Sequence, residues 1–278
     1  MPTLPEAVAE APAAAVPLRL ALRADPHQRY WLYVPPAARE RGARAPLVIS
    51  VHGISRNAGA HVRAWVRAAD RHGCIVVAPQ FSRQRFADFQ RFGRAGRIGP
   101  GGRADHVLWA VVDEVRSQLG LPEAPLRLFG HSAGAQFVQR MALAYGPRIG
   151  RCVLSAPGSY AWPDEGRCFP QGVAPSPDFA DLRPSLEHLL RPRTLVLVGE
   201  RDTERGSSLR QGPRIDAEQG RTRLERAHTY VHRLQMLAHA RGWEPPARLQ
   251  VLPAVAHAFS ECVAQAALID HAAAHLLA

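Results

Sequence analysis

The sequence contains no lysine, so all 35 of its basic residues are arginine. Alanine and proline are abundant along the whole chain, and this bias is typical of a genome-wide codon preference rather than of a binding surface. A formal net charge of +11 is therefore weak support for nucleic-acid binding, which usually also shows a helix-turn-helix, zinc-finger or single-strand-binding signature. The sequence has no such signature, and we expect no nucleic-acid partner.

Cysteine is scarce, with four residues in 278, and no pair has the C-x-x-C spacing of a zinc site. A domain of this size can bury a sufficient core without disulfides, so we expect reduced thiols, with Cys74 and Cys152 in the core. No run approaches the roughly 18 consecutive apolar residues of a membrane helix. Residues 1–17 lack the early basic residues of a signal peptide and are interpreted as a mobile arm. We therefore expect a cytoplasmic protein with no membrane partner.

Short apolar runs recur along the chain, and longer amphipathic stretches separate them. The runs are nearly continuous in valine, leucine and isoleucine, as burial on both faces of a parallel sheet requires. This alternation predicts one α/β domain over residues 18–278, with a mostly parallel twisted sheet and helices on both faces. The predicted strands lie at residues 45–53, 74–80, 126–132, 151–158, 193–200 and 247–253, and the helices at 60–73, 104–120, 135–146, 223–242 and 260–278.

Two stretches depart from this alternation. Residues 18–24 and 29–36 flank Asp25-Pro26 and predict an antiparallel hairpin at the edge of the sheet. Between two later strands, aromatic residues stand among prolines and glycines at the edge where open α/β sheets bind ligands. This pattern predicts a small cap insertion around residues 157–190, and a structural connector whose aromatics plug the sheet is the alternative. The aromatic residues are Tyr160, Trp162 and Phe169.

The segment LRLFGHSAGAQF places Ser132 between Gly130 and Gly134, after a predicted strand and before a predicted helix. In this context G-x-S-x-G is typical of a nucleophile elbow, a tight turn that exposes the serine hydroxyl. Such a hydroxyl is a weak nucleophile at neutral pH and needs a base, which in turn needs an acid to orient it. The chain must therefore supply a histidine and a carboxylate within reach of Ser132.

The segments RYWLYVPP, PLVISVHG and GHSAGAQ resemble, in this order, those of the α/β-hydrolase superfamily. Within it they are similar to the esterase branch that includes polyhydroxybutyrate depolymerases, although Ile54 stands where those depolymerases usually carry a cysteine. The resemblance extends over about residues 28–278. It implies the α/β-hydrolase fold and a triad in the chain order serine, acid, histidine.

The resemblance places the acid just past a strand, where LVLVGERDT provides Asp202. Glu200 ends that strand and should point elsewhere, and Asp164 is the rival because some relatives carry the acid after the preceding strand. His257, in LPAVAHAFS, follows the last strand and is the expected base.

Two histidine pairs have a four-residue spacing that can bind a metal on a helix. Neither pair has a glutamate base beside it or an evident third ligand, so we expect a helix face and no metal. The pairs are His228 with His232 and His271 with His275.

Attack on a carbonyl creates an oxyanion, which needs fixed backbone N–H donors. Ala133 directly follows the nucleophile and should provide one donor. The resemblance indicates Ile54, in the loop after SVHGIS, as the other. The residues expected to frame the substrate are His52, Gly53, His131, Tyr160, Trp162 and Phe259.

These observations predict a serine esterase that cleaves carboxylic esters through an acyl-enzyme, without a metal or organic cofactor. We expect a small-molecule ester with a short acyl group, because the cap is short. Amide or peptide hydrolysis is the alternative on the same fold. A non-catalytic binding protein is less favoured, because no part of the site is missing.

One arginine-rich stretch lies after the predicted strand at residues 74–80. Arginines that face the pocket would favour substrates bearing a carboxylate, and a solvated loop is the alternative. These arginines are Arg83, Arg85, Arg91, Arg94, Arg97 and Arg103.

Overall fold

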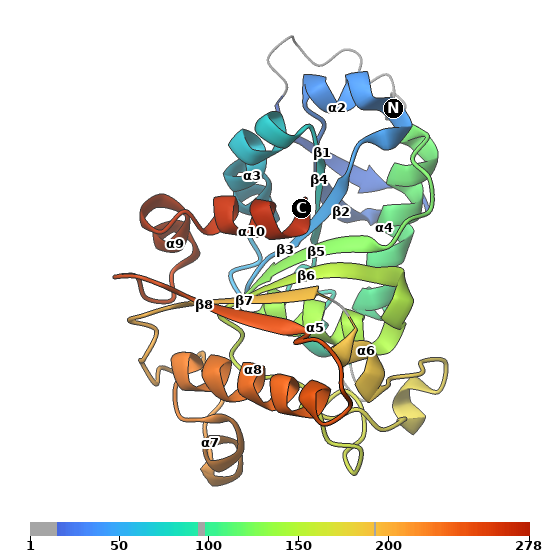
Figure 1. Ribbon diagram of the computed structural model, residues 1–278. Coiled ribbons are helices and arrows are strands. Elements are labelled where there is room, and N and C mark those ends of the chain that lie inside the picture. Colours follow the sequence, from blue (N-terminus) through green and yellow to red (C-terminus); the bar gives the residue numbers. More distant parts are fainter. Residues whose placement is uncertain (1–15, 94–97, 192) are drawn as a thin grey trace.

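The computed structural model describes residues 16–93, 98–191 and 193–278, so most of the predicted arm lies outside the described residues. Within these ranges the strands form one eight-stranded sheet in the order β1-β2-β4-β3-β5-β6-β7-β8 (Figure 1). The β1–β2 and β2–β4 pairs are antiparallel and the other five pairs are parallel. This arrangement confirms the predicted fold class and the N-terminal hairpin.

Burial along the strands follows their place in the sheet. All residues of the central β3 are buried, because helices cover both of its faces. The edge strand β8 leaves Val251 exposed. The strands are β1 (Leu18–Leu22), β2 (Asp25–Tyr33), β3 (Leu47–Val51), β4 (Ile75–Gln80), β5 (Leu126–His131), β6 (Ile149–Ser155), β7 (Arg193–Gly199) and β8 (Ala247–Leu252).

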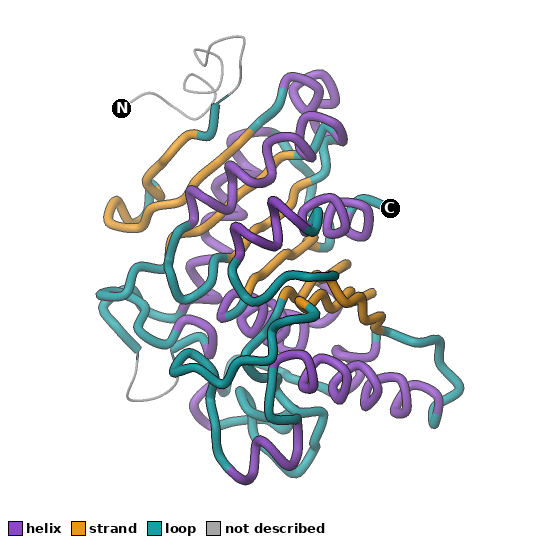
Figure 2. The backbone as a smooth tube through the Cα atoms, turned by 90° about the vertical axis from the view of Figure 1, so that its left-hand side faces the viewer, coloured by secondary structure: helices purple, strands orange, loops and turns teal. Residues whose placement is uncertain are grey.

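Helices flank the sheet on both sides, and their apolar faces form two separate core clusters (Figures 1 and 2). One side carries α3 (Ala58–His72), α9 (Phe259–Gln265) and α10 (Leu268–Leu276), while α2 (Pro36–Arg41) contacts α3. The other side carries α4 (Ala104–Leu119), α5 (Ala133–Tyr145), α6 (Leu186–Leu190) and α8 (Arg223–His239), with α7 (Pro213–Gln219) next to α8. Short 3-10 turns are η1 (Gly42–Arg44), η2 (Phe89–Arg91), η3 (Gly146–Arg148) and η4 (Pro177–Phe179).

One predicted helix is wrong in its extent. The stretch 260–278 forms two helices, α9 and α10, because Ala267 between them adopts a left-handed conformation with φ of 48°. The change of direction lets Leu268 and Ala272 pack into the core while α9 stays beside the loop that follows β8. Within the described ranges, no helix is both long enough and apolar enough to cross a membrane.

The predicted cap stretch packs closely against the rest of the molecule. It contains η4 and α6, and α6 contacts α5. Phe169 is buried between the rings of Phe92 and Phe179, so this aromatic fills the core. The four thiols are unpaired, and those of Cys74 and Cys152 are buried as predicted.

Candidate active site

The turn between β5 and α5 holds Ser132 in a strained conformation, with φ of 55° and ψ of −115°. Left-handed backbone is unfavourable for a residue with a side chain and persists where the surroundings enforce it. The two glycines permit the close approach. A Cβ atom at Gly134 would lie 2.1 Å from the carbonyl oxygen of Val51, and one at Gly130 would lie 2.3 Å from the oxygen of Gly134. The G-x-S-x-G pattern therefore forms the predicted elbow.

The structure brings Ser132, His257 and Asp202 together. His257 Nε2 lies 3.0 Å from Ser132 Oγ, and His257 Nδ1 lies 2.8 Å from Asp202 Oδ2. Because a carboxylate only accepts, Nδ1 donates to Asp202 and Nε2 is left to accept the hydroxyl proton of Ser132. The His257 side chain is 29% exposed, so its outer edge reaches solvent.

Asp202 has a second partner that the sequence did not reveal. Its other oxygen, Oδ1, lies 3.3 Å from Nη1 of Arg223, and both side chains are almost fully buried. Arg223 Nη2 also donates to Ser208 Oγ at 3.0 Å. Arg223 is the first residue of α8, and the Thr222 side chain caps this helix. No local motif marks Arg223, because 21 residues separate it from Asp202 and only the fold brings them together.

The rival carboxylates lie elsewhere. Glu200 is exposed and its Oε2 accepts the backbone N–H of Ala254, so it holds the turn before Asp202. Asp164 accepts the backbone N–H of Gly166 and pairs with Arg167. Asp202 is thus the acid that contacts His257.

Two buried histidines support the site from behind. His131 Nε2 donates to the carbonyl oxygen of His257 at 3.1 Å, while Nδ1 lies 2.9 Å from Ser155 Oγ. His52 Nδ1 donates to the carbonyl oxygen of Gly53 at 2.9 Å, and Nε2 accepts the N–H of Phe81 at 3.0 Å. Burial lowers the pKa of His131 to about 3 and that of His52 to about 4, so both rings are neutral.

The loop after β3 lies against the nucleophile. A Cβ at Gly53 would be 3.4 Å from that of Ser132, so the backbone here passes in van der Waals contact with the elbow. Ile54 follows, with its side chain 55% exposed. Ala133 begins α5, and its N–H therefore has no acceptor within the helix. Of the two predicted oxyanion donors, Ala133 directly follows Ser132. Ile54 directly follows Gly53, which lies close to Ser132.

Arg56 fixes this loop, and no local motif in the sequence marks it. Its guanidinium donates to the carbonyl oxygens of Phe81 and Phe86 at 2.7 and 2.8 Å and lies over the ring of Phe89. Burial lowers the pKa of Arg56 to about 10, within the range of a permanent cation at neutral pH. The loops after β3 and β4 are therefore tied together beside Ser132.

Several predicted substrate contacts need correction. His52 and His131 use both ring nitrogens within the protein, so their side chains offer no hydrogen-bonding group to a substrate. The ring of Tyr160 is buried against Tyr230, with the centroids 3.9 Å apart.

Trp162 and Phe259 are partly buried against the core, and Phe259 stacks on His61 with the ring centroids 4.0 Å apart. Most of the aromatic residues in and around the predicted cap fill gaps between the helices and the sheet. They act as a structural connector that plugs the sheet and do not form an open cap.

The arginine-rich stretch does not face one pocket as a group. Arg85 pairs with Asp25, and Arg103 pairs with Asp105 and Asp181. Arg83 is exposed, and Arg91 lies 3.5 Å from Asp88. Arg94 and Arg97 lie outside the described residues.

Of the two predicted histidine pairs, His228 and His232 are exposed, whereas His271 and His275 contact other groups of the protein. His275 Nε2 donates to the carbonyl oxygen of Arg193, and His271 Nδ1 lies 3.0 Å from the side-chain nitrogen of Gln250. The described part of the chain contains no group of three or more His, Cys, Asp or Glu residues that could hold a metal ion.

The chain is similar to proteins of known structure and to one family of esterases. The profile of the family described as Esterase PHB depolymerase matches residues 28–158. LpqC, a poly(3-hydroxybutyrate) depolymerase from Bordetella parapertussis, is 25% identical with a TM-score of 0.72, covering 98% of both chains. The fold is that of an α/β-hydrolase.

Other solved structures share this α/β-hydrolase fold. Poly(aspartic acid) hydrolase-1 from Sphingomonas sp. KT-1 is 24% identical with a TM-score of 0.75, covering 95% of this chain and 98% of that one. An S-formylglutathione hydrolase from Staphylococcus aureus is 15% identical with a TM-score of 0.58, covering 95% of this chain and 99% of that one. No curated protein matches the chain significantly. Together the family profile and the solved structures support an α/β-hydrolase of the serine-esterase type.

Proposed function

We propose that this α/β-hydrolase cleaves carboxylic esters with a triad of Ser132, His257 and Asp202. The observation that carries the proposal is the hydrogen-bonded chain from Ser132 Oγ through His257 to Asp202, set on a strained elbow. A weak nucleophile, a neutral imidazole nitrogen facing it and a carboxylate on the far nitrogen are the three parts that acyl transfer requires.

The steps follow from these contacts. His257 Nε2 takes the proton of Ser132 as Oγ attacks the carbonyl carbon of the ester, and the resulting imidazolium protonates the leaving alcohol as the ester bond breaks. Water then attacks the acyl-enzyme while His257 takes its proton, and Ser132 is regenerated as the acid product departs. Asp202 stays ionised and stabilises the imidazolium in both steps.

The backbone N–H groups of Ala133 and Ile54 are proposed as the oxyanion donors. Ala133 is supported by its place at the first position of α5, where the N–H and the helix dipole both favour negative charge. Ile54 is supported by the contact of Gly53 with Ser132. His131 holds the backbone of His257 and His52 holds the loop of Gly53, so these two histidines act as positioning residues.

An amidase is the second candidate. Its support is the likeness to poly(aspartic acid) hydrolase-1, with a TM-score of 0.75. A matched ester and amide of one acyl group distinguish the two reactions, because the amine leaving group of the amide needs stronger protonation by His257. We expect the ester to have the higher kcat/KM.

A fluorophosphonate probe and p-nitrophenyl esters of increasing acyl length test the proposal. Ser132→Ala should abolish labelling and ester turnover with little change in the thermal melt, because the hydroxyl packs against few atoms. Ser207→Ala, at an exposed serine, is the control and should keep both activities. Turnover of Ser132→Ala near the wild-type rate would overturn the assignment.

A further inference from the structure

A separate cavity of about 390 Å³ lies between α5, α7 and the loop after β6. Its volume is in the range of small-molecule sites. Among the described residues that line it, Glu218 is the only acidic one, whereas five are arginine. The arginines are Arg91, Arg140, Arg167, Arg210 and Arg214.

Two of these arginines have carboxylate partners. Arg167 makes a bidentate pair with Glu218, with N–O distances of 2.6 and 2.8 Å. Arg91 lies near Asp88. For the other three, no ion pair to a carboxylate occurs within the described ranges of the chain. The cavity therefore carries an excess of positive charge.

Arg140 is the clearest sign that this charge faces a ligand. The side chain is only 2% exposed, its Nε donates to Pro170 O and its Nη1 to Gln136 O, both at 2.9 Å. Burial, together with the cations of Arg91 and Arg210, lowers the pKa of Arg140 to about 9, while the charge of Asp88 opposes the change. A buried cation without a paired anion is costly, and an incoming anion would relieve that cost.

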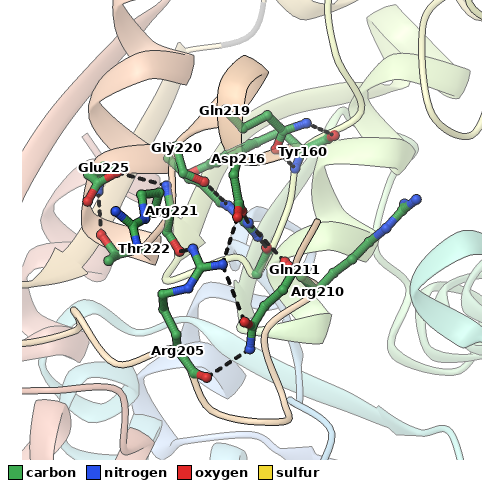
Figure 3. Close-up of polar contacts among 12 residues, drawn as sticks. Tyr160, Arg205, Arg210, Gln211, Asp216, Gln219, Gly220, Arg221, Thr222 and Glu225 are labelled. Atoms are coloured by element: carbon green, nitrogen blue, oxygen red, sulfur yellow. Dashed lines mark hydrogen bonds and ion pairs between the residues drawn. The ribbon is translucent and has the colours of Figure 1, made fainter. Parts of the chain in front are cut away.

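Arg210 is presented from a fixed backbone. Its carbonyl oxygen accepts Nη2 of the buried Arg226 at 2.9 Å, and the neighbouring Gln211 donates to Arg205 O at 2.8 Å. Asp216 joins Arg205 and Arg226, which ties α7 to the same network. Figure 3 shows the Arg210 side chain extending away from this cluster, with its guanidinium apart from the other residues drawn. The loop is thus preorganised while the Arg210 cation stays available.

A chain of hydrogen bonds through α5 links the lining of the cavity to Ser132. Ser159 lines the cavity and donates to the Gln136 side chain, and Gln136 N–H bonds to the carbonyl oxygen of Ser132. Arg140 stands eight residues after Ser132 on the same helix, which corresponds to about 12 Å of rise. An oligomer bound at Ser132 can span this distance, whereas the acyl group of a short ester cannot.

We propose that the arginine cavity binds a carboxylate of an oligomeric ester whose scissile bond lies at Ser132. The planar forks of Arg140, Arg210 and Arg214 match the two oxygens of a carboxylate. This assignment rests on the proposed esterase function and names its substrate class, an ester that carries a free carboxylate remote from the scissile bond. Short neutral esters would react at Ser132 without using the cavity.

Kinetics with two forms of one substrate test the proposal. A trimer of 3-hydroxybutyrate with a free carboxylate is compared with its methyl ester, and p-nitrophenyl butyrate reports the chemistry alone. We expect the acid trimer to be preferred at low salt, and Arg210→Gln/Arg214→Gln to raise its KM about tenfold or more. The rate with p-nitrophenyl butyrate should stay unchanged. A methyl ester preferred at low and high salt, or a double variant without effect, would overturn the proposal.

The control variant is Arg39→Gln/Arg241→Gln, which removes the same charge from two exposed positions. These positions precede β3 and β8 and therefore lie at the N-terminal ends of the parallel strands, away from Ser132. It should keep the wild-type KM for the acid trimer. An equal rise in KM would assign the effect to net charge and would count against the cavity.

Calorimetric titration of Ser132→Ala separates this proposal from the esterase function, because it needs no turnover. We expect the acid trimer to bind and the methyl ester to bind at least tenfold more weakly, with inorganic phosphate a weak competitor. Binding of phosphate alone would overturn the substrate assignment. If wild type fails to react with fluorophosphonate or p-nitrophenyl butyrate, the esterase function fails, and the titration still decides whether the cavity takes a carboxylate.

Discussion

At the scale of single residues, Asp202 is held from two sides. One oxygen accepts from His257 and the other lies beside Arg223, with the carboxylate 1% exposed. A buried carboxylate needs such partners, because desolvation without them would favour its neutral form. The Arg223 cation therefore offsets the cost of burying the carboxylate that orients His257.

Asp202→Asn should lower kcat far more than Asp164→Asn. Loss of the orienting carboxylate costs on the order of 10⁴-fold in serine proteases, because the imidazole takes the wrong tautomer. The side chain of Asp164 contacts Arg167 and the backbone N–H of Gly166, away from His257, and should tolerate the change. Steady-state kinetics with a short p-nitrophenyl ester measure both variants. A larger loss in Asp164→Asn would move the acid to the loop after β6.

Arg223→Gln should lower kcat for a short neutral ester about tenfold or more, with KM little changed. The reason is the loss of a charge-assisted contact to Asp202, an interaction of about 1.5–3 kcal/mol. Arg223→Lys, which keeps the charge, should restore part of the rate. Arg201→Gln, at an exposed arginine beside Asp202, is the matched control. Equal rates for the Gln and Lys variants would indicate that the charge has no role.

At the scale of elements, the elbow depends on contact between α5 and the end of β3. Gly134 lies in the first turn of α5, and its Cα faces the carbonyl oxygens of Val51 and His52. Backbone atoms of a buried strand cannot move aside as the end of a side chain can. The helix can therefore approach β3 only where the side chain is a hydrogen atom.

Gly134→Ala should destabilise the fold by about 1–3 kcal/mol and reduce fluorophosphonate labelling, because the added methyl group pushes α5 and Ser132 away from the loop of Gly53. Gly206→Ala, where no atom lies within 4 Å of the added Cβ, is the control. Urea unfolding and labelling rates measure the two effects. A Gly134→Ala protein as stable and as reactive as the control would exclude this account of the elbow.

At the scale of the whole molecule, buried neutral histidines link folding to pH. Burial lowers the pKa of His52 to about 4 and of His131 to about 3, and holds that of His61 well below its ordinary value. The unfolded chain binds protons near pH 6.5 while the folded chain does not. Their contribution to stability is therefore fully present above pH 6.5 and is lost as the pH falls below it.

The free energy of unfolding should fall between pH 7.5 and pH 5.5 by about 1.4 kcal/mol for each of these histidines. Carboxylates contribute little in this window because they titrate near pH 4. His61→Gln should show a smaller fall than wild type, whereas His228→Gln, at an exposed histidine, should match wild type. Urea unfolding at the two pH values measures the difference. A pH-independent unfolding energy would contradict the neutral buried state.

The sequence by itself determined the alternation of strands and helices and the elbow around Ser132. Burial on two faces demands continuous apolar runs, and a tight strand-to-helix turn demands glycine on both sides of the serine, so both leave local signals. The resemblance to the α/β-hydrolase superfamily, with its chain order of serine, acid and histidine, indicated Asp202 and His257 and left Asp164 as a rival. The break at Ala267 left no such signal, because the packing of α10 against the sheet decides it.

Only the tertiary structure decided which side chains surround the triad. Arg223, Arg56 and Arg140 are three of 35 arginines, and nothing in their neighbours distinguishes them from those on the surface. Their roles depend on contacts with residues 21 to 31 positions away, or with a cavity formed by separate elements. A charged side chain is tolerated on the surface almost anywhere, and it gains a defined role where folding buries it beside a fixed partner.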